Sequence, residues 1–464
     1  MIIRSGVLVA ALAGLAGAAP LDPNSAAARV AGGALLDGQA YADAQALSDR
    51  IGQRLAGSAA AERAVEWALA TMRAAGLKNV RREPVKIPRW LRGDERAEIV
   101  APASLPLHAA ALGGSVGTPK GGLTAEVIEV ATPDELKTIG ERARGKIVLF
   151  NKPMQRTRGF EGYGAAVGAR GRGAVEAAKV GAVAALIRSV GTGPGRLPHT
   201  GATRYDDQVA KIPFAALAAE DAELLHRLLA SGAVKVRLEL GAHVASDVES
   251  ANVVGEVPGR EKPGEIVVIG AHLDSWDLGA GALDDAAGCA IALEVGRLTA
   301  AVGGARRTLR VVLFMNEENG LSGARAYAEA HKAELSQHAA ALEADGGAGR
   351  PTGIAVVAPA ATPAPSLPLV TAWAAPLAAL QLDAPRVLDQ GGSDLRPLQS
   401  AGVPIVDVLQ DMSSYFDWHH SAGDTFDKID PHDLALDAVA YAVMAFAAAD
   451  APERLPPSPP PPRW

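Results

Sequence analysis

Cysteine is nearly absent from this sequence. Among 464 residues only Cys289 carries a thiol, so the chain cannot form a disulfide within itself. Aromatic residues make up 4% of the chain, and the formal net charge of -7 argues against nucleic acid as the main partner. Beyond the N-terminus, no apolar run reaches the roughly 20 residues that a membrane span requires. The length and the 48% hydrophobic content therefore predict a disulfide-free globular protein with more than one domain.

The first residues have the pattern of an export signal. A short positive segment ends at Arg4, an apolar run covers residues 7–16, and Ala16-Gly17-Ala18 is a small-x-small cleavage pattern. The apolar run is too short to favour a membrane span. We expect a signal peptide over residues 1–18, no membrane span in the mature chain, and a periplasmic or secreted location.

Acidic residues and histidines follow four predicted strands. The β-branched run 265–269 leads into a loop with His272, Asp274 and Asp284. Three further strands, 308–315, 338–344 and 404–409, lead to Glu317 with Glu318, to Asp345, and to His419 with His420. In open α/β sheets, ligands bind beyond the carboxyl ends of the strands. We therefore expect these side chains to converge.

Imidazole and carboxylate groups are ligands that suit a borderline divalent metal such as zinc. One His and one Asp from the first loop, a Glu from the second, an Asp from the third and a His from the fourth make five such ligands. Five are too many for one tetrahedral ion. A bridging carboxylate would give each of two ions three protein ligands. One glutamate of the Glu317-Glu318 pair would remain as general base on a metal-bound water. Taken singly, each residue also has a structural interpretation, and we expect Asp285 to cap the helix that begins near Ala286.

At these residues the sequence resembles the co-catalytic di-zinc exopeptidases, and within them the carboxypeptidase Q group. The resemblance lies in residues 272–277, 281–285, 317–318, 345 and 419–425. Ala271, Ala286 and Ala287 stand where relatives have glycine, and none of these changes removes an expected ligand.

The resemblance implies two zinc ions with one bridging carboxylate. Its ligands, in the order first site, bridge and second site, are His272, Asp345, Asp284, Glu318 and His420.

The resemblance also implies the residues that act around the ions. Glu317 would take the proton from the bridging water and pass it to the leaving amine, and Asp274 would hold the His272 ring. His420 is preferred to His419 because it lies four residues before Asp424, as in the family.

The fold that the resemblance implies is α/β, a mixed, mostly parallel central sheet flanked by helices. This zinc exopeptidase domain would cover residues 19–121 and 250–454, with strands near 80–85 and 97–100 in the outer part of its sheet. Residues 122–249 resemble an inserted protease-associated α/β domain. The Pro-rich residues 455–464 predict a disordered tail.

Three residues are candidates for substrate contact. Ser393 and Asp394 lie in a Gly-rich turn that could line the pocket or cap a helix. Tyr415 could stabilise an oxyanion or pack in the core. In the insert, Arg156, Arg158, Arg170 and Arg172 could meet acidic substrate groups or another subunit, or belong to a solvated loop. The stretch His199-Thr200-Gly201 is assigned no chemistry.

The predicted function is zinc-dependent hydrolysis of short peptides or dipeptides, of the carboxypeptidase Q type, and the resemblance suggests a homodimer. An aminopeptidase of the same superfamily is the alternative, because it uses the same zinc core and the sequence does not place the groups that recognise a free terminus. Two further alternatives are glutaminyl cyclisation with a single zinc and a non-catalytic receptor ectodomain. The five ligands argue against the first, and an intact Glu317 argues against the second.

Overall fold

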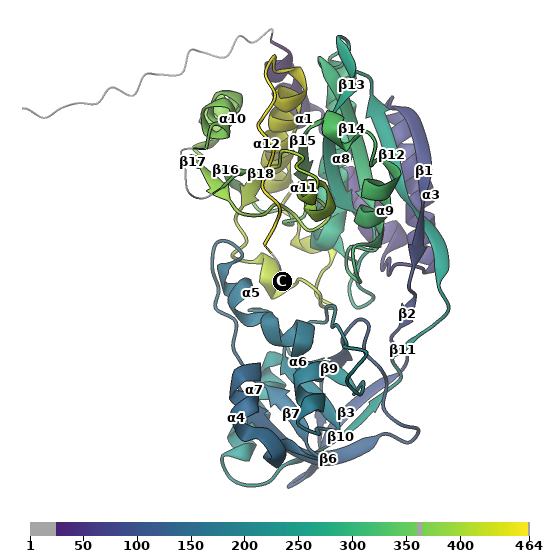
Figure 1. Cartoon of the computed structure of the whole chain (residues 1–464), viewed down its shortest axis with the longest axis vertical. Helices are drawn as coiled ribbons and strands as arrows, with labels where there is room; N and C mark the ends of the chain where they lie inside the picture. The colour runs from purple at the N-terminus through teal and green to yellow at the C-terminus, as the bar shows by residue number, and fades with distance from the viewer. Residues whose placement is uncertain (1–24, 360–363, 463–464) are drawn as a thin grey trace, which may run out of the picture.

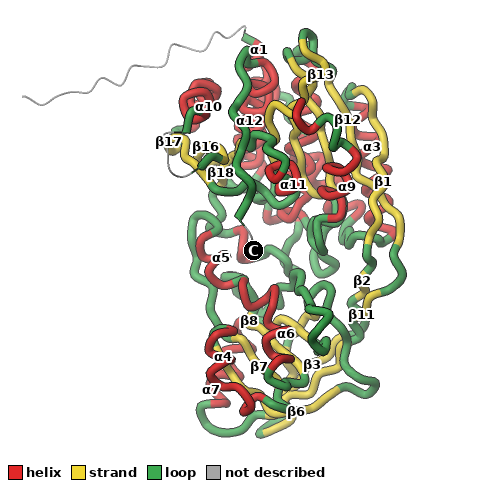
Figure 2. Tube along the Cα trace, viewed as in Figure 1, coloured by secondary structure: helices red, strands yellow, loops and turns green. Residues whose placement is uncertain are grey.

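The computed structural model describes residues 25–359 and 364–462, so the predicted signal peptide lies outside the described residues. The protein consists of two bodies stacked along its long axis (Figure 1). The chain passes between them twice, and β2 (Trp90–Leu91) pairs with β11 (His243–Val244) at this crossing. Loops from both bodies meet in the middle of the molecule (Figure 2).

The upper body in Figure 1 is built on a five-stranded sheet. Its strands, in spatial order, are β1 (Lys78–Ile87), β12 (Val248–Val257), β14 (Arg307–Phe314), β13 (Lys262–His272) and β15 (His338–Glu343). Strand β13 is parallel to both of its neighbours, whereas β12 is antiparallel to both of its own. The sheet is therefore mixed, as predicted, but parallel pairing is confined to β13, β14 and β15.

Strand β13 is buried on both faces. Val267 and Ile269 belong to the core on the face that α8 (Ala287–Ala301) covers, whereas Ile266 and Val268 pack on the opposite face with residues of α9 (Ser322–Ala330). Because side chains alternate along a strand, coverage of both faces requires a continuous apolar run. This explains why the sequence shows no polar alternation before His272.

Helices cover the sheet on both sides. The helices of the upper body are α1 (Ala26–Leu36), α2 (Ala40–Gln45), α3 (Ala59–Ala74), α8 (Ala287–Ala301), α9 (Ser322–Ala330), α10 (Ser366–Ala374), α11 (Arg396–Ser400) and α12 (Pro431–Asp450). Contrary to the expectation from the sequence, α12 is long and apolar enough to cross a membrane. However, 78% of its apolar stretch is buried inside the protein. Its contacts with α1 and α8 identify it as a core helix.

A smaller sheet completes the upper body. It contains β17 (Asp383–Leu388), β16 (Pro351–Val357) and β18 (Val406–Gln410). The Pro-rich segment packs on this region, with Leu455 and Ser458 buried. The Ser458 hydroxyl accepts a hydrogen bond from the Ile405 amide at 3.0 Å and donates one to the Val357 carbonyl at 3.1 Å. The predicted disorder of this tail is therefore wrong for residues 455–462, because these contacts fix it without a helix or strand.

The lower body contains an eight-stranded sheet. In spatial order its strands are β4 (Leu105–Leu107), β3 (Glu95–Ala101), β10 (Lys235–Leu240), β6 (Leu123–Val130), β7 (Ile147–Phe150), β8 (Ala184–Arg188), β9 (Phe214–Leu217) and β5 (Ala109–Ala111). Its helices are α4 (Pro133–Ile139), α5 (Glu161–Ala166), α6 (Gly168–Lys179) and α7 (Ala219–Leu229). Strands β6 to β9 are parallel to one another and are buried between helices, which gives this body its own core.

One predicted strand belongs to the other body. Residues 97–100 were expected in the peptidase sheet, but they lie in β3, which pairs with β10 and β4 of the lower body. The apolar alternation of β3 marks a half-buried strand without specifying which sheet it joins. The lower body therefore recruits residues 95–111 in addition to the predicted insert, residues 122–249.

A buried histidine far from the strand-end loops gives a prediction for stability against pH. His338 accepts a hydrogen bond from the Tyr327 hydroxyl at 2.9 Å and donates one to the Glu334 carbonyl at 3.1 Å. Burial lowers the pKa of His338 to about 4. Between pH 6.5 and 4 the unfolded chain thus binds a proton that the folded chain does not. As the pH is lowered through this range, the free energy of unfolding decreases by about 1.4 kcal/mol per pH unit from this group.

We expect His338→Gln to remove that dependence. Urea unfolding of the metal-free protein at several pH values should show a shallower decline between pH 6.5 and 4 for the variant. Parallel curves for the two proteins would contradict the assignment.

Candidate metal centre

The predicted site residues lie at one edge of the central sheet. Because β13, β14 and β15 are parallel neighbours, their carboxyl ends coincide. His272 is the last residue of β13, and the loops after β14 and β15 carry Glu318 and Asp345. The loop after β18 brings His420 to the same place. Asp284 lies just before α8, and its side chain contacts both histidines.

The Asp284 carboxylate lies between two imidazoles. Its Oδ1 is 2.9 Å from Nε2 of His272, and its Oδ2 is 3.1 Å from Nε2 of His420. Asp345 completes the first side, with Oδ1 3.6 Å from Nε2 of His272, and Glu318 completes the second, with Oε2 3.0 Å from Nε2 of His420. Each carboxylate oxygen of Asp284 thus faces a different pair of metal-binding groups.

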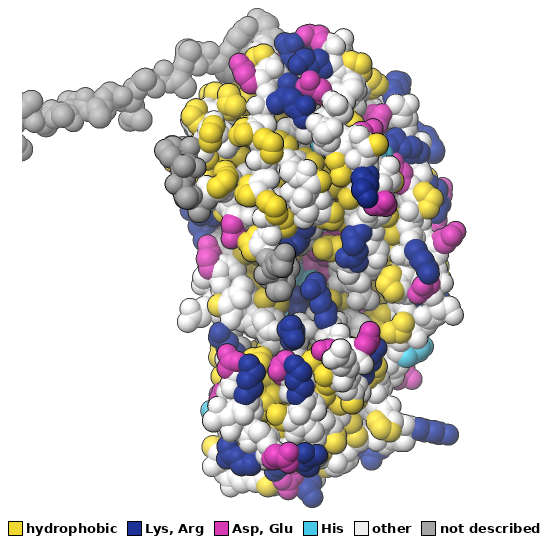
Figure 3. All heavy atoms as spheres, viewed as in Figure 1, with side chains coloured by type: hydrophobic (Ala, Val, Ile, Leu, Met, Phe, Trp, Pro, Cys, Tyr) yellow, Lys and Arg dark blue, Asp and Glu magenta, His cyan; other side chains and the backbone are white. Residues whose placement is uncertain are grey.

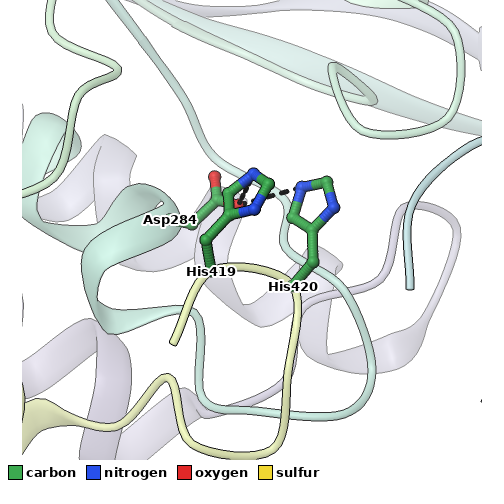
Figure 4. Close-up of side chains that lie close together, drawn as sticks. All are labelled: Asp284, His419 and His420. Atoms are coloured by element: carbon green, nitrogen blue, oxygen red, sulfur yellow. Dashed lines mark ion pairs between the residues drawn. The ribbon is translucent and has the colours of Figure 1, made fainter. Parts of the chain in front are cut away.

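His419 is the weaker of the two candidate histidines. Its Nε2 is 3.6 Å from Asp284 Oδ2, and its ring stacks on that of His420 with centroids 3.5 Å apart. Figure 4 shows both rings beside Asp284. Only His420 also contacts Glu318. In this geometry His420 contacts both Asp284 and Glu318, whereas His419 contacts Asp284.

The donor set fits divalent metal ions. Glu318 Oε1 is buried and has no hydrogen-bond partner among the described residues, and the buried Asp284 Oδ2 faces the Nε2 atoms of His420 and His419 at 3.1 and 3.6 Å. Burying such charges without compensation is costly, and a cation between them would remove that cost. A cavity of about 10 Å³, the space of one water-sized sphere, lies against Asp284, Glu318 and His420.

Crowding of carboxylates perturbs their titration. Burial raises the pKa of Glu318 to about 7, and the charge of Asp284 adds to the rise. Burial also raises the pKa of Glu317 well above its usual range, with further contributions from the charges of Asp345 and Glu318. Metal ions invert this balance because they stabilise the ionised forms.

The comparisons with known proteins agree with this geometry. A family model described as peptidase family M28 matches residues 252–447. Carboxypeptidase Q of Mus musculus is 41% identical over 414 residues, which cover 88% of this chain and 85% of that protein. The chain belongs to peptidase family M28.

Solved structures extend the likeness to most of the chain. The M28 peptidase precursor from Shewanella amazonensis is 39% identical, with a TM-score of 0.88, and the match covers 94% of this chain and 98% of that one. A zinc aminopeptidase from Bacillus subtilis shares the fold, with a TM-score of 0.67 and 21% identity over 90% of this chain and 96% of that one. This M28 member is a zinc-dependent metallo-exopeptidase.

In this M28 peptidase, Asp274 contacts the His272 ring through its backbone carbonyl and not, as predicted, through its carboxylate. The Nδ1 of His272 donates to the Asp274 backbone carbonyl at 3.0 Å, whereas the carboxylate lies 3.9 Å from that nitrogen. The carboxylate instead accepts from the backbone amides of Asn316, at 2.6 Å, and Glu317, at 3.1 Å. Asp274 therefore orients the His272 ring through its main chain and anchors Glu317 through its side chain.

Two further aspartates shape the backbone around Asp284. Asp424 accepts hydrogen bonds from three successive amides, at 3.0 Å from Ala282, 2.7 Å from Leu283 and 3.2 Å from Asp284. Asp285 accepts from Gly288 at the start of α8, as predicted for a cap, and also from the His272 amide, both at 3.0 Å. From the sequence, Asp424 was used only for its spacing from His420, so its hydrogen bonds to the three amides were not predicted.

Arg54 is a second residue whose role the sequence did not reveal. Its fully buried guanidinium donates to the carbonyls of Leu273, Ala280 and Gly281 at 3.0, 2.6 and 2.9 Å, and to Gly52 at 3.0 Å. It thereby closes both ends of the loop between His272 and Asp284.

We expect Arg54→Lys to lower the free energy of unfolding by about 3 kcal/mol, because lysine cannot reproduce the planar fork and leaves buried carbonyls without donors. Urea unfolding measures this loss. Arg63→Lys, at an exposed position on α3, should change the stability by less than about 0.5 kcal/mol. Equal effects of the two substitutions would contradict the role of Arg54.

The three candidates for substrate contact have different environments. Asp394 is fully buried, and neither of its carboxylate oxygens has a hydrogen-bond partner among the described residues. The backbone amides of Asp394 and Leu395 donate to Glu343, both at 3.2 Å, so the Gly-rich turn is anchored below the site. Ser393 is half-buried. Tyr415 is buried, with its ring 5.0 Å from that of His419, as in the packing alternative.

Proposed function

We propose that this M28 peptidase holds two zinc ions and hydrolyses short peptides or dipeptides in the manner of a carboxypeptidase Q. The observation that carries the proposal is the Asp284 carboxylate, whose two oxygens face His272 on one side and His420 on the other. Asp345 and Glu318 would complete the two sites. The 41% identity to carboxypeptidase Q of Mus musculus supports the substrate class.

Bound zinc would supply an activated water and polarise the scissile carbonyl. Within the chain, Glu317 is the group that exchanges protons: its carboxylate takes a proton from the attacking water and returns it to the leaving amine. Asp274 fixes the Glu317 backbone at 3.1 Å and so keeps this carboxylate beside the ligand set. Of the three candidates for substrate contact, the half-buried Ser393 would line the path of the substrate.

The lower body is proposed to be a protease-associated domain inserted over residues 122–249. Its parallel strands β6 to β9 between helices support this assignment. Lying across the mouth of the site, it would limit the length of the peptides admitted. Export through residues 1–18 and homodimer formation complete the proposal.

The alternative is an aminopeptidase of the same family. Aminopeptidase YwaD from Bacillus subtilis is 28% identical over 62% of this chain and 57% of its own length. Because both activities use the same ligands, specificity depends on whether the pocket recognises a free carboxylate or a free amine.

Dipeptides blocked at either end distinguish these activities. For the zinc-loaded protein, we expect chelator-sensitive cleavage that tolerates an N-terminal block but not a C-terminal one. Cleavage of only C-terminally blocked peptides would indicate an aminopeptidase, and cleavage of only doubly free ones a dipeptidase. Absence of any cleavage by protein with zinc bound would contradict the proposal.

A further inference from the structure

The loop that carries His420 is held largely by the other body of the protein. The carboxylate of Asp417, three residues earlier, accepts hydrogen bonds from both terminal nitrogens of Arg156, at 2.6 and 3.0 Å. The Thr192 hydroxyl donates to the same carboxylate at 2.7 Å, and the Thr192 amide donates to the Phe416 carbonyl at 3.0 Å. Arg156 also donates to the carbonyl of Ser413. Two segments of the insert, around Arg156 and Thr192, therefore bind the residues before His420 through hydrogen bonds.

The contacts continue to the histidine pair itself. The Nδ1 of His199 donates to the His419 carbonyl at 2.6 Å. The Thr200 amide donates to the His420 carbonyl at 2.9 Å, and the Thr200 carbonyl lies 3.3 Å from Nδ1 of His420. Because a carbonyl oxygen only accepts hydrogen bonds, the proton in the contact between His199 and His419 lies on Nδ1 of His199.

These contacts fix both the backbone and the ring of His420. Its φ of +62° lies in the left-handed region, which is unfavourable for a non-glycine residue and persists only where its surroundings impose it. The Nδ1 of His420 faces the insert, 3.3 Å from the Thr200 carbonyl and 3.4 Å from Nη1 of Arg170, so that Nε2 faces Asp284 and Glu318. The insert thus helps to set the position and orientation of a metal-binding ring.

The close approach of the two bodies is built into the sequence. A Cβ atom at Gly193 would overlap the Asp417 carbonyl, and one at Gly191 would overlap the His199 ring. Tyr163 of the insert also stacks on Phe416, with centroids 4.8 Å apart. Glycine at these two positions permits the contact that a side chain would prevent.

We propose that Arg156, Thr192, His199 and Thr200 of the insert form a clamp that positions His420 for zinc. The insert is then a structural component of the metal centre as well as a cover over it. Seating of the insert and occupation of the zinc site made by Glu318 and His420 are coupled, whereas the site made by His272 and Asp345 is independent of the clamp. This inference rests on the proposed two-zinc function.

Zinc affinity of the full-length protein tests the clamp. We would titrate wild type, Asp417→Ala and His199→Leu with zinc against a chromophoric chelator, and confirm folding by circular dichroism. We expect two equivalents in wild type, and in both variants one equivalent that binds about 10- to 100-fold more weakly while the other is unchanged.

Two controls separate positioning from general damage. His199→Asn keeps a donor near the place of Nδ1 and should restore most of the affinity lost in His199→Leu. Glu223→Ala removes the ion pair of Glu223 with Arg188, 3.2 Å apart within the insert, and should leave both equivalents unchanged.

The outcomes are distinct. Wild-type affinity for both equivalents in Asp417→Ala and His199→Leu, or equal weakening of both, would overturn the clamp. Fewer than two equivalents in the wild type would instead overturn the two-zinc proposal itself.

Discussion

Glu317→Gln will lower kcat for a dipeptide substrate by about 10²- to 10⁴-fold while the zinc content stays close to that of the wild type. Glutamine keeps the shape of the side chain but cannot take a proton from the attacking water. Glu317 is not among the groups that contact His272 or His420, so metal binding does not depend on it. Steady-state kinetics and metal analysis of the same preparation give both quantities.

The neighbouring acid is the matched control. Glu318→Gln should lose activity together with one equivalent of zinc, because Glu318 contacts His420 at 3.0 Å. The division of roles between the two glutamates would be contradicted if Glu317→Gln lost as much zinc as Glu318→Gln, or if it kept more than about a tenth of the wild-type kcat.

The second large effect is expected at the bridge. Asp284→Ala should bind less than one equivalent of zinc at concentrations that saturate the wild type, and its activity should be undetectable. The substitution removes a ligand from both ions at once and leaves His272 and His420 facing an empty space. Metal analysis after gel filtration, followed by assay in added zinc, measures both consequences.

Asp277→Asn tests whether any acid of this loop would have the same effect. Asp277 pairs with Arg92 at 2.5 Å, away from the ligand set, and its loss should leave the zinc content unchanged. Retention of two equivalents by Asp284→Ala would contradict the bridging role.

The parts of the site that could be predicted are those that the chain encodes locally. Each ligand lies at the end of a strand or in the loop after it, and the carboxyl ends of parallel strands coincide, so convergence follows once β13, β14 and β15 are adjacent. The choice of His420 over His419 needed the resemblance, since adjacent histidines have no distinguishing pattern in the sequence.

The parts that could not be predicted depend on contacts between distant segments. Arg54 meets the Leu273 carbonyl across 219 positions, and His199 meets the His419 carbonyl across 220. Residues 97–100 have the alternation of a strand, yet nothing in that alternation selects a sheet. For residues 455–462, composition indicated disorder, whereas the buried Ser458 hydroxyl pairs with two backbone groups of the upper body.

Anomalous diffraction at the zinc edge, from crystals of the zinc-loaded protein, would show directly whether two zinc ions share Asp284. We expect two peaks about 3.5–4 Å apart, one on each side of the Asp284 carboxylate, the first beside His272 and the second beside His420. A single peak, or two peaks that do not share Asp284, would contradict this expectation.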